Sequence, residues 1–155
     1  MYKKTYFRGG SEMRIFEKVR EDDAIIPTRS TKGSAGYDFY SNADITISPH
    51  YIELVPTGIK ARFESDEVLQ LYNRSSNPIK KGLMLANSVG IVDSDYYGNP
   101  SNDGEIMFAF YNFLDLTVKI KKGEKIGQGV FIKYLTTDND MTDGERTGGF
   151  GSTGN

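Results

Sequence analysis

The chain has 155 residues, which suits one domain with its own core, and its 19 basic and 21 acidic residues give a formal net charge of −2. Because the two signs are mixed along the chain and form no basic stripe, we expect no binding to nucleic acid polymers. The absence of cysteine fits a cytoplasmic location, the single histidine excludes the common zinc sites, and no apolar run is long enough to predict a membrane span.

Residues 1–12 show no period, and we expect them to be an extension or leader outside the fold. From residue 13 to residue 144, short runs of alternating apolar and polar residues predict β-strands; in one run, Ile59, Ala61 and Phe63 alternate with charged residues. Turn-forming residues separate these runs at short intervals, which predicts a single all-β domain, either a sandwich or a barrel. The other clear runs span residues 14–19, 68–72, 106–113 and 126–134.

A single short helix is expected over residues 76–81. Ser75 or Ser76 can cap its start, a proline suits its first turn, and Gly82 can end it. Arg74 precedes the two serines, so a guanidinium and two hydroxyls meet the unpaired N–H groups of a helix N-terminus, a combination that suits phosphate. The alternative is an ordinary helix cap beside a solvated arginine.

Residues 87–98 read as an apolar strand that ends in carboxylates and then turns back as a hairpin. A carboxylate at such a rim can orient and deprotonate a water molecule. Asp93 and Asp95 have the same parity on an extended chain, so strand geometry alone does not select the base. Two other interpretations stay open: both carboxylates can be solvated turn formers, or they can bind a metal ion directly as a pair.

The last eleven residues, 145–155, contain glycines, two hydroxyls, one arginine and one aromatic ring, with almost nothing to bury. Backbone N–H groups beside glycine can approach an anion, and Ser152 and Thr153 add donors. Arg146 adds fixed charge, and Phe150 offers a face to a flat ring. The composition therefore predicts a flexible arm that closes over a nucleotide, with a frayed tail as the alternative.

Five segments of the chain resemble, in order and spacing, the five motifs of the homotrimeric dUTPases (deoxyuridine 5′-triphosphate nucleotidohydrolases). The match runs from about residue 13 to the end, and Ser76 together with a long hairpin makes the chain most similar to the enzymes of Gram-positive bacteria and their phages. The segments are residues 35–39, residues 74–76 with Lys80, residues 90–98, residues 123–128 and residues 146–154.

The resemblance implies a jelly-roll-like β-barrel with one short helix, assembled as a homotrimer whose C-terminal arms are exchanged between subunits. It implies that water attacks the α-phosphorus of dUTP, giving dUMP and pyrophosphate, which limits uracil incorporation into DNA and supplies dUMP for thymidylate synthesis. Asp93 is then the catalytic base, Asp95 supports the site, and Tyr96 lies beneath the deoxyribose and rejects a 2′-hydroxyl. Mg²⁺ is implied as a cofactor held by substrate phosphates and water, with no protein ligand.

The resemblance also implies which residues bind the substrate. Uracil is read by the backbone of the hairpin at Gly90 and Val92, with the side chain of Asn87 nearby, while Phe150 stacks on the base. The remaining assignments are Arg74, Ser75, Ser76 and Gln128 on the triphosphate, Gly151, Ser152 and Thr153 at its outer end, and Asp38 as the support of Arg146.

The chain departs from the family pattern in three places. Asn73 stands where many relatives have proline, Lys125 takes a position that is often arginine, and residues 99–104 lengthen the hairpin, which can alter a rim or a partner surface. Two alternatives to dUTP hydrolysis stay open. A dCTP deaminase has a similar fold and triphosphate site, and a phage-type protein of this family can also act as a nucleotide-dependent regulator that binds another protein.

Overall fold

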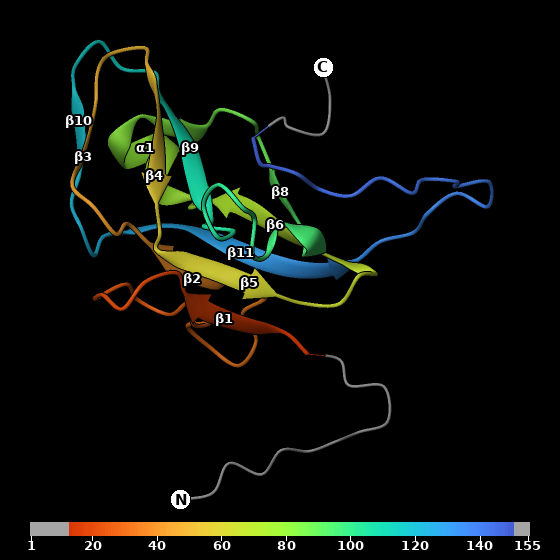
Figure 1. Ribbon diagram of the computed structural model, residues 1–155. Helices are drawn as coiled ribbons and strands as arrows, with labels where there is room; N and C mark the ends of the chain where they lie inside the picture. The colour runs from red at the N-terminus through yellow and green to blue at the C-terminus, as the bar shows by residue number, and fades with distance from the viewer. Residues whose placement is uncertain (1–12, 151–155) are drawn as a thin grey trace, which may run out of the picture.

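The computed structural model describes residues 13–150 (Figure 1). In this range it contains eleven strands, one α-helix and one 3₁₀-helix, so the expected all-β architecture with a single short helix is confirmed. No helix among these residues is long and apolar enough to cross a membrane. In chain order the elements are β1 (Ile15–Lys18), β2 (Tyr37–Tyr40), β3 (Ile45–Ile47), β4 (Ile52–Pro56), β5 (Ile59–Arg62), β6 (Glu67–Asn73), α1 (Ser76–Lys81), β7 (Leu83–Leu85), β8 (Gly90–Asp93), η1 (Ser94–Tyr96), β9 (Met107–Asn112), β10 (Val118–Ile120) and β11 (Lys125–Lys133).

Two antiparallel sheets form the body of the molecule (Figure 1). The larger sheet has the strand order β2-β11-β6-β8, and the smaller has the order β4-β9-β7. Two ribbons, β1-β5 and β10-β3, complete the fold. Phe39 of β2 and Phe108 of β9 are almost fully buried, and their ring centroids are 5.5 Å apart, so the main core lies between the two sheets.

Every run that the sequence predicts as a strand coincides with a strand of the structure: β1, β5, β6, β9 and β11. The alternation has the expected cause, because Ile59 and Ala61 are buried while Lys60 and Arg62 are not. Five further strands, β2, β3, β4, β7 and β10, have only three to five residues each. Such short segments complete too few periods to stand out in the sequence.

The predicted helix is confirmed, but its predicted serine cap is wrong. Helix α1 ends at Gly82, which has a φ of 64° and donates its N–H to the carbonyl of Asn77. Ser75, the residue before the helix, already has right-handed helical φ and ψ, and no side-chain cap forms. Instead, the Asn77 N–H donates to the carbonyl of Arg74 at 3.1 Å, so the backbone itself closes the first turn.

The predicted hairpin after β8 is also wrong. Strand β8 pairs with β6, whereas β9 pairs with β4 and β7 in the other sheet. The chain leaves β8 through η1, and the buried Tyr96 draws it into the core before residues 99–104 turn it toward β9. The two strands therefore lie in different sheets, and the connection between them packs on the protein.

Candidate active site

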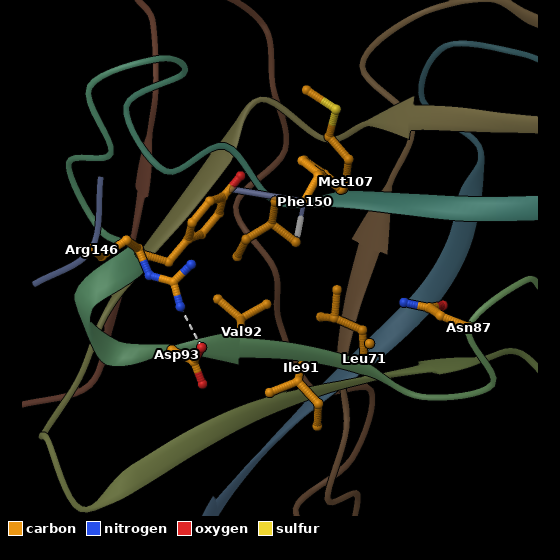
Figure 2. A pocket seen from close by; sticks show the side chains of 11 residues that line it. Leu71, Asn87, Ile91, Val92, Asp93, Met107, Arg146 and Phe150 are labelled. Atoms are coloured by element: carbon orange, nitrogen blue, oxygen red, sulfur yellow. Dashed lines mark hydrogen bonds and ion pairs between the residues drawn. The ribbon is translucent and has the colours of Figure 1, made fainter. Parts of the chain in front are cut away.

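A pocket of about 290 Å³ lies beside β8, where η1, β6, β9 and the arm meet (Figure 2). We use "the arm" for residues 145–155, of which the structure describes 145–150. The pocket brings together seven residues that the sequence predicts for the site: Asn87, Gly90, Val92, Asp93, Tyr96, Arg146 and Phe150. Its other lining residues are apolar: Leu71, Ile91, Ile106 and Met107.

Side chains along β8 alternate between buried and exposed positions, and this alternation sets how each residue lines the pocket. Gly90 and Val92 are buried, whereas Ile91 and Asp93 are exposed. Gly90 lies opposite Leu71 of β6, and a Cβ added at Gly90 would come within 3.0 Å of the Leu71 Cβ. The Leu71 side chain therefore packs directly against the β8 backbone and contributes an apolar surface to the pocket.

The two ends of the pocket carry different chemistry. Figure 2 shows Asn87, an amide, at one end and the carboxylate of Asp93 with the guanidinium of Arg146 at the other, with Val92 and Leu71 between them. An amide can both donate and accept hydrogen bonds, which suits a nucleobase edge, whereas a carboxylate can accept a proton. The pocket thus has a recognition end and a reactive end.

Arg146 lies between two carboxylates of its own chain. Its Nη2 donates to Asp93 Oδ2 at 2.5 Å, and its Nε donates to Asp95 Oδ1 at 2.7 Å. These contacts raise the pKa of the Arg146 guanidinium above its ordinary value, with the hydrogen bond to Asp95 as the largest cause. The Arg146 side chain is only 13% exposed, whereas both carboxylates are about half exposed, so water reaches the two acids.

The structure distinguishes Asp93 from Asp95, which parity alone does not. Asp93 ends β8 and lines the pocket, while Asp95 lies in η1 and is not among the pocket residues. Both carboxylates bond to Arg146, but only Asp93 also lines the pocket. The geometry therefore favours Asp93 as the base and Asp95 as a support that holds Arg146.

Tyr96 forms a buried wall of the pocket, with 8% of its surface exposed. Burial is the main cause that raises the pKa of Tyr96, so its hydroxyl stays neutral. The arm passes beside this ring: the Arg146 guanidinium lies 5.9 Å from the ring centroid, and a Cβ added at Gly149 would lie 2.8 Å from Tyr96 Cε2. The Tyr96 ring therefore lines the pocket and also contacts the arm.

Arg74 and Gln128, two of the residues expected to hold the triphosphate, lie in a second group together with Asp38 and Lys125. We call these four residues the polar cluster. Arg74 Nη1 donates to the carbonyl of Lys125 at 3.1 Å, and Lys125 Nζ lies 2.9 Å from Asp38 Oδ2. Gln128 Nε2 donates to the carbonyl of Asn73 at 3.3 Å. Ser75 and Ser76 follow Arg74 at the start of α1.

The first motif supports the polar cluster from β2. A Cβ added at Gly36 would lie 2.2 Å from Gln128 Oε1, so any other residue at this position would force the end of the glutamine side chain to move. Burial acts to raise the pKa of Asp38, but the hydrogen bonds from Lys125 and Ser30 outweigh it, and the pKa lies below its ordinary value. Asp38 is therefore an ionised member of the polar cluster.

The Asp93 end of the pocket and the polar cluster lie toward opposite ends of β6. Asp93 pairs with Val68 near the start of this strand, and Arg74 follows Asn73 at its end. These six residues span about 20 Å at the usual rise of a strand. One chain therefore does not bring the reactive carboxylate next to the residues expected to bind phosphate.

Some sequence-based assignments stay predictions. Gly151, Ser152 and Thr153 lie outside the described residues, as do residues 1–12. In the single chain, Arg146 contacts Asp93 and Asp95, whereas Asp38 contacts Lys125 and Ser30, so the predicted support of Arg146 by Asp38 would need a second subunit.

Sequence reasoning did not identify the apolar pocket residues Leu71, Ile91, Ile106 and Met107. Ile91 lies within the third motif. The other three lie outside the motifs: Leu71 is in β6, which pairs with β8, and Met107 begins β9, which Ile106 directly precedes. Within residues 13–150, no group of three or more His, Cys, Asp or Glu side chains could hold a metal ion.

Comparisons with known proteins identify the family of the chain. The dUTPase family model matches residues 22–154. The deoxyuridine 5′-triphosphate nucleotidohydrolase of Lactococcus lactis subsp. lactis (strain IL1403) is 53% identical over 142 residues, which cover 90% of this chain and 95% of that protein. The protein of the same name from Helicobacter pylori (strain P12) is 35% identical over 147 residues, covering 92% and 97%.

Solved structures show the same fold. The crystal structure of dUTPase from Streptococcus mutans superposes with a TM-score of 0.78 at 47% identity, covering 80% of this chain and 98% of that one. The dUTPase from phage phi11 of S. aureus has a TM-score of 0.71 at 20% identity, covering 85% and 97%, and shows the fold alone. From the family match, the identities and the shared fold together, this chain belongs to the dUTPase family.

Proposed function

We propose that the chain hydrolyses dUTP to dUMP and pyrophosphate by attack of water on the α-phosphorus. The observation that carries this proposal is the pocket beside β8, which has Asn87 at one end and the half-exposed carboxylate of Asp93 at the other. The close relatives from Lactococcus and Helicobacter carry the name of this activity. The reaction keeps uracil out of DNA and supplies dUMP for thymidylate synthesis.

The nucleoside occupies the pocket. A volume of about 290 Å³ lies at the lower end of the range for small-molecule sites, which suits a base and a sugar but not a whole triphosphate. Uracil binds at the Asn87 end, along the backbone of Gly90 and Val92, and Phe150 stacks on it. The triphosphate then leaves the pocket past Asp93.

Asp93 acts as the general base. Its carboxylate takes a proton from a water molecule, whose oxygen attacks the α-phosphorus as the bond to the bridging oxygen of pyrophosphate breaks. Asp95 supports the site beside the base, and in the single chain its carboxylate accepts a hydrogen bond from Arg146. Tyr96 lies beneath the deoxyribose, where its ring leaves no room for a 2′-hydroxyl.

The enzyme assembles as a homotrimer in which three subunits build each site. The separation of about 20 Å between Asp93 and Arg74 along β6 supports this arrangement, because both must act on one triphosphate. One subunit supplies Arg74, Ser75, Ser76 and Gln128, and a second supplies Asp93 and Tyr96. A third subunit lends its arm, with Arg146 supported by Asp38, and Gly151, Ser152 and Thr153 close on the outer end of the triphosphate.

Magnesium enters as part of the substrate. The phage phi11 dUTPase coordinates a structural Mg(II) ion, but residues 13–150 of this chain offer no group of three metal ligands. In the single chain, Asp93 and Asp95 both bond to Arg146 and do not form a free pair of carboxylates. The family resemblance implies that the ion would be held by phosphate oxygens and water, and we assign no protein ligand to it.

A cytoplasmic location follows from this role, since the substrate belongs to the nucleotide pool.

A regulatory protein partner remains a prediction. The phage 80alpha dUTPases, described as controlling transfer of virulence genes, are 18% identical to this chain and share the fold with it.

The direct test measures pyrophosphate and ammonia released from dUTP and from dCTP. The proposal predicts pyrophosphate from dUTP and no ammonia from either nucleotide. Ammonia released from dCTP would instead identify a dCTP deaminase and overturn the proposal.

A further inference from the structure

The loop formed by residues 99–104 packs against Tyr96 through its two ends, Asn99 and Gly104, while Pro100 and Ser101 are exposed. The N–H of Asn99 donates to the carbonyl of Tyr96 at 3.1 Å, and Asn99 is 3% exposed. Gly104 has a φ of 82°, and a Cβ added there would lie 2.6 Å from the carbonyl oxygen of Tyr96. Glycine is therefore required at the point where the loop returns past η1.

Two further contacts hold the loop in place. The N–H of Asp103 donates to the carbonyl of Asn99 at 2.7 Å, which closes the turn. The Asp103 carboxylate accepts from Lys60 Nζ of β5 at 2.6 Å. The loop is thus anchored both on itself and on a neighbouring strand, so it can act as a fixed support.

Asn102 connects this support to the pocket. Its Oδ1 accepts the N–H of Gly104 at 3.1 Å, and its Nδ2 donates to the Tyr96 hydroxyl at 2.7 Å. Because the Gly104 N–H can only donate, the oxygen of the amide must face Gly104 and the nitrogen must face Tyr96. The hydrogen bonds therefore fix which way the amide points.

The Tyr96 hydroxyl is bonded on both sides. It accepts from Asn102 and donates to the carbonyl of Glu105 at 2.8 Å. The Glu105 carboxylate in turn accepts the N–H of Gly58 at 2.9 Å, so the second partner is also part of a buried network. A ring bonded in this way cannot tilt without breaking a buried hydrogen bond.

We propose that Asn102 is a positioning residue that fixes the Tyr96 ring and thereby sets the preference for deoxyribose over ribose. This inference rests on the proposed function, in which the ring lies beneath the sugar. The Tyr96 ring can exclude a 2′-hydroxyl only if the ring stays in place. A small displacement of the ring would make room for ribose. Residues 99–104 thus support sugar selectivity.

The test compares kcat/KM for dUTP and UTP in the parent enzyme and in Asn102→Ala. The ratio of the two values should fall about three- to tenfold, the effect expected for one lost hydrogen bond, mainly because UTP becomes a better substrate. Ser101→Ala is the matched control, because its hydroxyl bonds to Asn99 and not to Tyr96. That control should keep the parent ratio.

Two more variants separate positioning from folding. Asn102→Asp retains an oxygen for the Gly104 N–H but removes the donor to Tyr96, so the loop keeps its turn and the ratio should still fall. If Asn102 acts through the hydroxyl, combining Asn102→Ala with Tyr96→Phe should change the ratio no further than Tyr96→Phe alone.

An unchanged ratio in both folded Asn102 variants, or additive effects in the double variant, overturns the proposal. Failure of both Asn102 variants to fold overturns it as well, because the residue would then serve the fold. A parent enzyme that releases no pyrophosphate from dUTP would instead refute the proposed function.

Discussion

The two ends of β6 differ in how they are built. The start of β6, at Val68, lies beside Asp93, the half-exposed carboxylate at the rim of a pocket with apolar walls. Beyond Asn73 lies the polar cluster, where Arg74, Lys125 and Asp38 already have partners within the chain. The first region has the shape for a nucleoside and a carboxylate that bonds to Arg146 but is half exposed to water, whereas the second is an ordered network of donors and acceptors. Neither region alone can bind and hydrolyse a nucleoside triphosphate.

The largest effect is expected at the pocket end. Asp93→Asn should lower kcat for dUTP by about 10²–10⁴, the range for a lost general base, because the amide cannot take a proton from water. Calorimetry with a non-hydrolysable dUTP analogue should show little change in affinity, since the variant keeps the size of the side chain.

Asp95→Asn is the matched control for this prediction. It changes a neighbouring carboxylate that also contacts Arg146 but does not line the pocket. A nearly normal Asp93→Asn enzyme beside a crippled Asp95→Asn enzyme would show that the wrong carboxylate has been assigned as the base.

A smaller effect on kcat/KM is expected when the deoxyribose of the substrate is replaced by ribose. UTP should be a poorer substrate than dUTP by about 10²-fold in kcat/KM, because Tyr96 occupies the space of a 2′-hydroxyl and its own hydroxyl is held on both sides. Steady-state kinetics with both nucleotides measures the ratio. Comparable values would show that the pocket end does not select the sugar.

The arm should respond to ligand more than either end of β6. Its described part contacts the pocket end chiefly through Arg146 and two half-exposed carboxylates, which is a weak attachment in water. Amide hydrogen exchange in the arm should slow by about tenfold or more once a dUTP analogue and Mg²⁺ are added. Equal exchange with and without saturating ligand would argue against closure.

The smallest effect is expected at the polar cluster and concerns stability. Asp38→Asn should lower the free energy of unfolding by about 1 kcal/mol at pH 7, through the loss of the contacts with Lys125 and Ser30. The folded-state pKa of Asp38 lies below its ordinary value of 3.8, so this contribution is present above that pH and is lost as the pH falls further.

Denaturant unfolding at several pH values and one protein concentration checks this dependence. Asp115→Asn is the control, because the Asp115 side chain is 98% exposed and should contribute little at any pH. An Asp38 effect that persisted well below pH 3.8 would contradict the assigned ionisation.

The sequence predicted the parts of the fold that depend on local chemistry. Alternation located β5, where Ile59 and Ala61 face the core, and Gly82 ended α1 because it can adopt a positive φ. Strand pairing was harder to predict from the sequence. Strand β8 was expected to pair with the strand that follows it, but it pairs with β6. Pairing depends on which faces can be buried together, and one strand's pattern does not record its partner.

The candidate site divides in the same way. Asn87, and Asp93 as the base, were assigned through the resemblance to the dUTPase motifs, and both residues line the pocket. Ile106 and Met107 could not, because an apolar residue looks the same in a core and in a pocket wall. Nor could parity choose between Asp93 and Asp95, because the chain changes from strand to 3₁₀-helix between them.

The central claim is that the arm and the base of one site come from different subunits, and a mixing experiment tests it directly. Two inactive proteins, Asp93→Asn and a truncation ending at Glu145, are denatured and refolded together in equal amounts. Each mixed trimer then contains one site with both an intact base and an intact arm, so about a quarter of the parent activity should return. No regained activity, in a sample whose mixed trimers are confirmed by native mass spectrometry, would mean that the arm serves the Asp93 of its own chain.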